Sequence, residues 1–385
     1  MQKGASGDAV TIAYRLTASG PSGRMSPDAA PHKNLRMPDI PRLAYPVDSP
    51  PAPGETIAIA PRVLWLRMPL PFALDHINLW LLPEAAGGAT LVDTGFGDEA
   101  TRRLWERHAA TTLASMPIRS IVATHYHPDH LGNAAWLAER YACDVAMTQA
   151  EYLTAHAISG QFGGYTPEAV VDLFRRHGME ETHVAALVKR GNRYRSGVPE
   201  LPQTFDRMLA GDLRRAGDTE WRIVAGHGHS PDHASLYCAE RGILISGDML
   251  LPRISTNVSV SAINPDGNPL RRFLDSLDAF AGLPEETLVL PSHGLPFRGI
   301  NVRIAQLRAH HDARLAELQA ALESASAPLS AADLVPVLFR RELDIQQRYF
   351  AMGEAVAHLN FLWRAGRVER RVAADRTIRF APAVG

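Results

Sequence analysis

The stretch THYHPDH at residues 124–130 contains three histidines and an aspartate, and it directly follows the apolar run RSIVA at 119–123. An apolar run of this kind is typical of a buried strand, so the polar cluster begins where that strand ends. Imidazole and carboxylate groups are costly to bury unless a partner satisfies them. The stretch therefore predicts a metal ion at the end of this strand.

Three later motifs repeat the arrangement of an apolar run followed by a metal-binding residue type. They are AGHGHSPDH at 225–233, LISGDML at 244–250 and LVLPSHG at 288–294. Four strand ends that each deliver such a side chain are a stronger signal than one motif. Three protein ligands per zinc ion leave an open position, as a catalytic site requires.

Several other histidines are expected to have structural roles. His227 is interpreted as a strand residue and His233 as a hydrogen-bonding residue near the site. His310 and His311 are expected on the solvated face of a helix.

The composition excludes several classes of protein. The 385 residues include 40 basic and 41 acidic side chains, which disfavours a general polyanion-binding protein. Only Cys143 and Cys238 occur, so neither a disulfide framework nor a thiolate zinc site is indicated. The sequence contains no long apolar run and no secretory signal pattern, which predicts a cytoplasmic protein without a membrane partner.

The chain divides into three parts by composition and hydrophobic pattern. Residues 1–55 are rich in proline, serine and glycine and are predicted to be a disordered tail. Residues 56–300 alternate strand and helix patterns, which indicates a layered α/β domain. Within it, residues 148–210 read as successive helices and are interpreted as a helical cap insertion. Residues 301–385 begin with a long amphipathic helix and end with a predicted hairpin after Gly366, which outlines a winged-helix-like domain.

The motif set, preceded by LVDTG at 91–95, resembles the metallo-β-lactamase superfamily, and all five motifs occur in order. The resemblance implies a four-layer αββα sandwich with the helical cap insertion and the C-terminal winged-helix-like domain. It implies that Asp93 supports the metal-binding loop from behind. It also implies two metal ions with seven protein ligands, which are His125, His127 and His229 for the first ion, Asp129, His130 and His293 for the second, and Asp248 for both.

The same resemblance implies a binuclear hydrolase that uses a metal-bridging hydroxide, with Asp129 and Asp248 as catalytic residues. Two Zn²⁺ ions per chain are expected, with iron or manganese as alternatives. Within the family, the presence of Asp248 points away from true β-lactamases and toward glyoxalase II-type thioesterases, lactonases and RNA-processing enzymes. The sequence GDMLLPR at 247–253 lacks the tyrosine that lactonases of the superfamily usually carry there. A small-molecule thioester or ester, such as an acyl-CoA, is therefore the expected substrate.

Two alternatives remain open. The C-terminal segment resembles the winged-helix appendage of β-lactamase-like hydrolases. Because this branch includes an RNA-cleaving enzyme, a nuclease function is one alternative. Residues 301–385 carry only 12 arginines against 9 acidic residues, so nucleic-acid binding is not favoured. Persulfide dioxygenases use a related ligand set for a single iron. The sequence does not identify the physiological substrate, the native metal or the oligomeric state.

Overall fold

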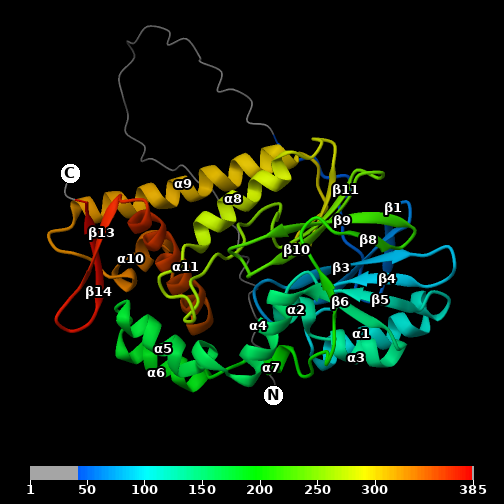
Figure 1. The fold of residues 1–385 in the computed structure, drawn as a ribbon, viewed down its shortest axis with the longest axis horizontal. Helices are drawn as coiled ribbons and strands as arrows, with labels where there is room; N and C mark the ends of the chain where they lie inside the picture. Colours follow the sequence, from blue (N-terminus) through cyan, green and yellow to red (C-terminus); the bar gives the residue numbers. More distant parts are fainter. Residues whose placement is uncertain (1–41, 384–385) are drawn as a thin grey trace, which may run out of the picture.

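The computed structural model describes residues 42–383, and two facing β-sheets form its centre (Figure 1). The first sheet has seven strands in the order β1-β2-β3-β4-β5-β6-β7. Strands β1 to β4 pair antiparallel, whereas β4 to β7 pair parallel. These strands are β1 Thr56–Ala60, β2 Val63–Pro69, β3 His76–Pro83, β4 Ala89–Val92, β5 Ile118–Val122, β6 Asp144–Thr148 and β7 Asp206–Met208.

The second sheet has five strands in the order β12-β11-β10-β9-β8. Alternate residues of its inner strands enter two different cores. Ile243 and Ile245 pack toward the first sheet, whereas Leu244 packs toward the helices on the opposite face. The strands are β8 Leu213–Ala216, β9 Thr219–Gly226, β10 His233–Cys238, β11 Ile243–Gly247 and β12 Leu288–Pro291.

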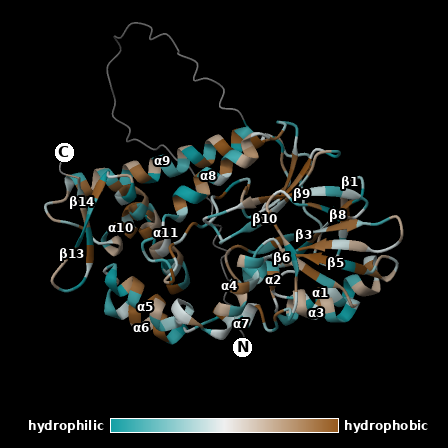
Figure 2. Cartoon of the chain, viewed as in Figure 1, coloured by the Kyte–Doolittle hydropathy of each residue, from teal (hydrophilic) through white to brown (hydrophobic). Residues whose placement is uncertain are grey.

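Helices cover the outer face of each sheet. Figure 1 shows α1 and α3 beside the first sheet, and α8 and α9 on the far side of the second. The predicted four-layer αββα sandwich is therefore confirmed. Figure 2 shows the apolar residues concentrated in the strands between these layers. The helices of this part are α1 Glu99–Ala110, η1 Thr112–Ala114, α2 Pro128–Leu131, α3 Ala134–Tyr141, α8 Pro269–Ala281 and α9 Ile300–Ser324.

Part of the segment predicted to be a disordered tail packs against the sandwich. Residues 1–41 lie outside the described residues, but residues 42–55 contact the sandwich. Ala44 forms a β-bridge with Arg298, and Pro51 is buried. The frequent prolines prevent regular strand pairing in this segment, yet they do not prevent packing. The boundary predicted at residue 55 is therefore wrong for residues 42–55.

The insertion between β6 and β7 is helical, as predicted. Its elements are α4 Gln149–Gly160, η2 Gly163–Tyr165, α5 Pro167–Arg176, α6 Glu181–Arg190 and α7 Tyr194–Gly197. The predicted range of 148–210 is too long at its end, because β7 lies within it and pairs with β6. The pairing of so short a strand is not visible in the sequence pattern.

The C-terminal part has the expected order of helices followed by a hairpin. After α9 come α10 Ala331–Leu338, α11 Ile345–Arg364, β13 Val368–Val372 and β14 Ile378–Pro382. The expectation of a solvated face is wrong for His311, which is 1% exposed. Its Nδ1 lies 3.2 Å from Nε2 of His358, because α11 packs across this face of α9.

The cap and the C-terminal part share one hydrophobic core. Phe174 and Leu187 of the cap belong to the same buried cluster as Leu359 and Phe380. The His177 ring stacks on Phe380, with ring centroids 6.3 Å apart. The cap is therefore not a separable lid, because the end of the chain covers its apolar face.

Within residues 42–383, none of the helices has the length and apolar character needed to span a membrane.

His177 should make the stability of this shared core depend on pH. Burial, reinforced by Arg370 and Arg176, lowers the pKa of His177 to about 3, and neither ring nitrogen has a hydrogen-bond partner. An unfolded histidine has a pKa of about 6.5, so below that pH the unfolded state binds a proton that the folded state excludes. Stability should therefore fall as the pH drops from about 6.5.

We expect His177→Phe, which retains a flat ring, to reduce this loss by about 1 kcal/mol between pH 7.5 and 5.5. Urea unfolding at the two pH values measures the free energy. His183→Phe, at a partly exposed position on α6, should retain the wild-type loss. If His177→Phe lost as much stability between pH 7.5 and 5.5 as the wild type, His177 would not be the source of the pH dependence.

Candidate metal centre

The predicted site residues come together at one edge of the sandwich, because the carboxyl ends of β5, β9, β11 and β12 meet there. His125 and His127 follow β5, and His229 lies in the loop after β9. Asp248 and His293 follow β11 and β12. The structure places the ligand atoms of these residues in two groups, His125, His127, His229 and Asp248 in one and Asp129, His130 and His293 in the other.

The first group is built on three imidazoles. Nε2 of His125 lies 2.9 Å from Nδ1 of His127 and 3.2 Å from Nε2 of His229. In a tetrahedral site with metal–nitrogen bonds of about 2.0–2.1 Å, neighbouring ligand atoms are about 3.3–3.4 Å apart. The spacing of the three nitrogens is close to that geometry.

Asp248 lies between the two groups, with one carboxylate oxygen toward each. Its Oδ2 is 3.4 Å from Nε2 of His229 in the first group. Its Oδ1 is 3.5 Å from Nε2 of His130 and 3.4 Å from Nε2 of His293 in the second group. Asp129 Oδ2 completes the second group at 3.4 Å from His293 Nε2. A carboxylate in this position can bridge two ions.

Asp93 fixes the loop after β5 from behind. It accepts hydrogen bonds from the backbone N–H and the hydroxyl of Thr124, at 2.8 and 2.9 Å. Nδ1 of His130 lies 2.8 Å from its Oδ2. Asp93 has a φ of 60°, a left-handed conformation that its three partners hold in place. Asp93 therefore occupies the supporting position that the family resemblance implied.

Hydrogen bonds to Nδ1 of His229 and His293 determine that Nε2 of each ring faces the site. Nδ1 of His229 lies 2.8 Å from the carbonyl oxygen of Asn257, and Nδ1 of His293 lies 2.7 Å from that of His76. A carbonyl can only accept, so each Nδ1 must carry the proton. Each Nε2 is then left with a lone pair toward the site, as metal binding requires.

Gly247 and His233 support Asp248. Gly247 has a φ of 54°, and an added Cβ would lie 2.3 Å from Nε2 of His233. The absence of a side chain lets the backbone N–H of Asp248 donate to this nitrogen at 3.1 Å. His233 therefore has the expected role of a hydrogen-bonding residue near the site. His227 lies outside the two groups, with Nδ1 3.1 Å from Asp232.

Glu151 is a functional candidate that sequence reasoning missed. This fully buried carboxylate on α4 accepts from the backbone N–H of Tyr126 at 3.0 Å. It also accepts from the hydroxyl of Ser230 and the N–H of Asp232, both at 2.7 Å. Glu151 thus joins the loop of His125 and His127 to the loop of His229. Its partners are mainly backbone atoms, which leave no signal in the sequence.

The electrostatics separate the two groups. Burial lowers the pKa of His125 well below its ordinary value and that of His127 to about 3, and neighbouring histidines contribute. Burial opposes charge on His293 too, but Asp248 and Asp129 outweigh it and raise its pKa to about 9. His125 and His127 are therefore held as neutral imidazoles, whereas the carboxylates of Asp129 and Asp248 favour the charged form of His293.

These residues fit a pair of metal ions. Among the described residues, three atoms of the two groups are buried without a hydrogen-bond partner, namely His130 Nε2, His293 Nε2 and Asp248 Oδ1. Buried polar atoms are nearly always paired, so their convergence indicates a missing partner. Imidazole and carboxylate donors suit zinc, iron and manganese.

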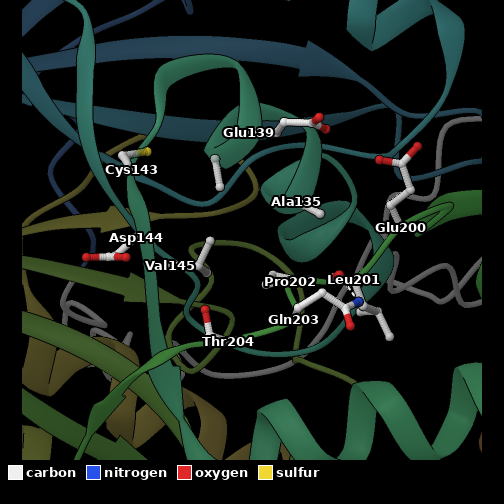
Figure 3. Close-up of a pocket in the computed structure, with 11 residues that line it drawn as sticks. Ala135, Glu139, Cys143, Asp144, Val145, Glu200, Leu201, Pro202, Gln203 and Thr204 are labelled. Carbon is white, nitrogen blue, oxygen red and sulfur yellow. Dashed lines mark hydrogen bonds between the residues drawn. The ribbon is translucent and has the colours of Figure 1, made fainter.

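A separate surface pocket of about 410 Å³ lies between α3, β6 and residues 200–204 (Figure 3). Glu139, Cys143 and Asp144 are among the residues that line it. None of the seven candidate ligands does, so this pocket is not part of the metal centre.

Comparison with known proteins identifies similar sequences and structures. The sequence profile of the Metallo-beta-lactamase superfamily matches residues 74–293, and that of the Metallo-beta-lactamase-like, C-terminal domain matches residues 315–383. A crystal structure of a beta-lactamase domain protein from Burkholderia ambifaria is 46% identical, covers 89% of this chain and 98% of its own, and gives a TM-score of 0.82.

Two curated proteins are more distantly similar. The Probable metallo-hydrolase YqjP of Bacillus subtilis (strain 168) is 25% identical over 310 residues, which are 78% of this chain and 92% of that protein. The Hydroxyacylglutathione hydrolase of Xanthomonas axonopodis pv. citri (strain 306) is 24% identical over 272 residues, which are 70% of this chain and 80% of that protein.

Glu151→Ala should weaken both the fold and the metal centre. The substitution leaves three donors without their acceptor, and each unsatisfied buried group costs about 1–3 kcal/mol. We expect a loss on the order of 3 kcal/mol in the free energy of unfolding, and roughly 10-fold weaker zinc binding. Glu139→Ala, at an exposed position on α3, should change stability by less than about 0.5 kcal/mol. Equal stability of the two variants would refute the role of Glu151 in joining the two loops.

Proposed function

This chain belongs to the metallo-beta-lactamase superfamily, and we propose that it is a binuclear metal-dependent hydrolase acting on a small-molecule thioester or ester. The observation that carries the binuclear part is the position of Asp248, with one oxygen toward each ligand group. All seven ligands that the family resemblance implied lie in these two groups.

The chain's own residues would act in two ways. His125, His127 and His229 would hold the first ion, Asp129, His130 and His293 the second, and Asp248 both. When bound, the two ions would supply an activated water and a Lewis acid for attack on a carbonyl carbon. Asp129 is partly accessible, and one oxygen faces His293. Its other oxygen would be free to accept a proton and pass it to the leaving group.

The thioester assignment is supported by one relative and by the cap. The name of the Xanthomonas relative gives hydroxyacylglutathione as its substrate, and this compound is a thioester. In the cap, Phe162 is 67% exposed, and Lys189 and Arg193 are also exposed. These groups could contact an acyl chain and an anionic carrier such as coenzyme A. Phe174 cannot, because it is buried in the shared core.

The nucleic-acid alternative is disfavoured by the arginines of the C-terminal part. Arg370 pairs with Asp266 at 2.8 Å, and Arg364 donates to the backbone carbonyl of Asp266 at 2.7 Å. Arg367 donates to Gln319, and Arg371 pairs with Glu369. Arg364 and Arg370 therefore tie the C-terminal part to the loop before α8, and Arg367 and Arg371 have partners within the C-terminal part, which supports a packing role.

Metal content distinguishes the binuclear hydrolase from a mono-iron dioxygenase. We expect close to two ions per chain by elemental analysis after loading with zinc. Asp248→Asn removes the bridging charge and should lower both occupancy and turnover, the latter by at least about 100-fold. Asp312→Asn, at an exposed position on α9, should bind two ions. A stoichiometric single iron in the protein as isolated, with no second ion bound after zinc loading, would favour the dioxygenase.

A substrate panel tests the reaction itself. The zinc-loaded protein should release thiol from acyl-CoA and acylglutathione substrates, as measured with a thiol reagent, and should leave RNA oligonucleotides intact. Replacement of Arg364, Arg367, Arg370 and Arg371 by alanine should keep thioester turnover within a few-fold. RNA cleavage, with salt-sensitive RNA binding that this variant loses, would support the nuclease instead.

A further inference from the structure

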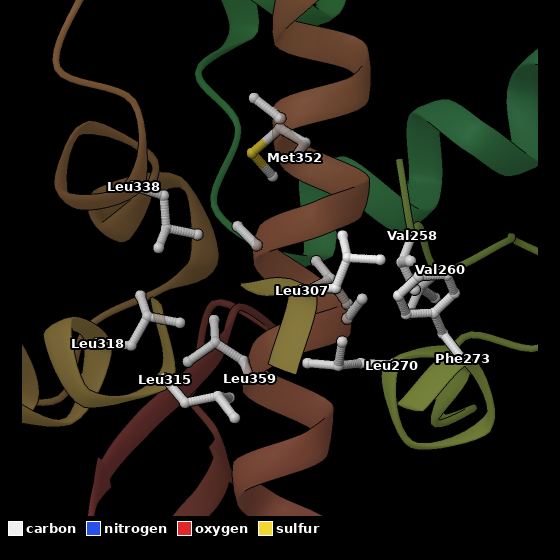
Figure 4. Close-up of a cluster of buried hydrophobic side chains, with 14 of the residues drawn as sticks. Val258, Val260, Leu270, Phe273, Leu307, Leu315, Leu318, Leu338, Met352 and Leu359 are labelled. Atoms are coloured by element: carbon white, nitrogen blue, oxygen red, sulfur yellow. The ribbon is translucent and has the colours of Figure 1, made fainter. Parts of the chain in front are cut away.

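The segment 254–262 connects the metal centre to the C-terminal part. It lies between β11 and α8 and runs along α11, and Val258 and Val260 enter the core beside this helix (Figure 4). The seven candidate ligands all belong to the sandwich. This segment, however, contacts both α11 and one of these ligands, His229.

At the metal centre, the segment holds the outer nitrogen of His229. Nδ1 of His229 lies 2.8 Å from the carbonyl oxygen of Asn257 and 2.8 Å from the hydroxyl oxygen of Thr256. The bond to the carbonyl fixes the tautomer and the ring plane. The position of His229 Nε2 in the first group therefore depends on where the Asn257 carbonyl lies.

At α11, side chains and backbone hold the same segment. The amide of Asn257 donates to Glu354 at 3.3 Å and accepts from the hydroxyl of Ser259 at 2.6 Å. The N–H of Val260 donates to the carbonyl of Gly353 at 3.1 Å. A Cβ on Gly353 would lie 2.6 Å from the Ser259 hydroxyl oxygen, so only glycine permits this close approach.

Packing alone does not account for a carboxyl group at position 354. Its neighbours Gly353 and Ala355 are buried, whereas Glu354 is partly exposed, and burial of its carboxyl raises its pKa to about 7. An apolar residue would be easier to accommodate there. The carboxyl at this position accepts a hydrogen bond from the Asn257 amide.

We propose that Glu354 is a positioning residue of the metal centre, which orients His229 through Asn257 and so makes α11 part of the first metal site. The proposal rests on the binuclear centre proposed above, but it is independent of the substrate. It assigns the C-terminal part a role in metal binding that neither RNA binding nor simple packing provides.

Metal titration of the full chain tests this proposal. Each titration uses two backgrounds, His293→Asn to leave the first group and His127→Asn to leave the second. Metal-free protein is titrated with Zn²⁺ against a chromophoric chelator, and with Co²⁺ to record its visible spectrum. Glu354→Ala should weaken binding to the first group roughly 10-fold and shift its Co²⁺ spectrum, while binding to the second group stays within about 2-fold.

Two further variants serve as controls. Glu354→Gln offers an amide oxygen to Asn257 and should restore first-group affinity to within about 2-fold of wild type. Glu323→Ala, at an exposed position on α9, should bind as wild type does. Asn257→Ala keeps the carbonyl but loses both side-chain bonds, so it should weaken first-group binding at least as much as Glu354→Ala, and the double variant should lose no more than Asn257→Ala alone. Asn257→Ala decides the question if Glu354→Ala does not fold.

Unchanged first-group affinity in both alanine variants would overturn the proposal. Equal weakening of both groups with a lower unfolding temperature would also overturn it, because it would show a purely structural role. Failure of the unsubstituted chain to bind zinc would instead refute the proposed metal centre.

Discussion

Seven imidazole and carboxylate groups are taken out of water at one edge of the sandwich, with their inner nitrogen and oxygen atoms facing one another. That arrangement is stable only if each group is held from behind. Asp93 holds the loop of His130, Glu151 joins two loops, and Asn257 holds His229. These supports come from different parts of the chain, so the site depends on the relative placement of both sheets, the cap and the C-terminal part.

The candidate ligands could be predicted because their signal is local. THYHPDH contains four of the seven within six residues, and each remaining ligand follows an apolar strand. A strand's side chains alternate, so its end fixes where the next polar group lies. The sandwich was predictable for the same reason, and the family resemblance supplied the pairing of residues with the two groups. Asp93 was recognisable only through the LVDTG motif.

The supports were harder to predict because their partners are distant or belong to the backbone. Glu151 binds two backbone N–H groups and one hydroxyl, and nothing in the surrounding sequence distinguishes it from a surface glutamate. Glu354 accepts from Asn257, which lies almost 100 positions earlier in the chain. His311 was assigned to solvent because the amphipathic pattern of α9 does not show that α11 covers it. Long-range packing decides all three cases.

The shared core of cap and C-terminal part also constrains how the chain is made. Phe174 leaves the ribosome about 200 residues before Phe380, its partner in the same cluster. At ~5–20 residues per second, the cap's apolar face waits roughly 10–40 s for its cover during synthesis. The sheets can assemble in that interval, but the cap cannot be completed. Until the C-terminal part emerges, the nascent chain therefore exposes an apolar surface that the finished fold buries.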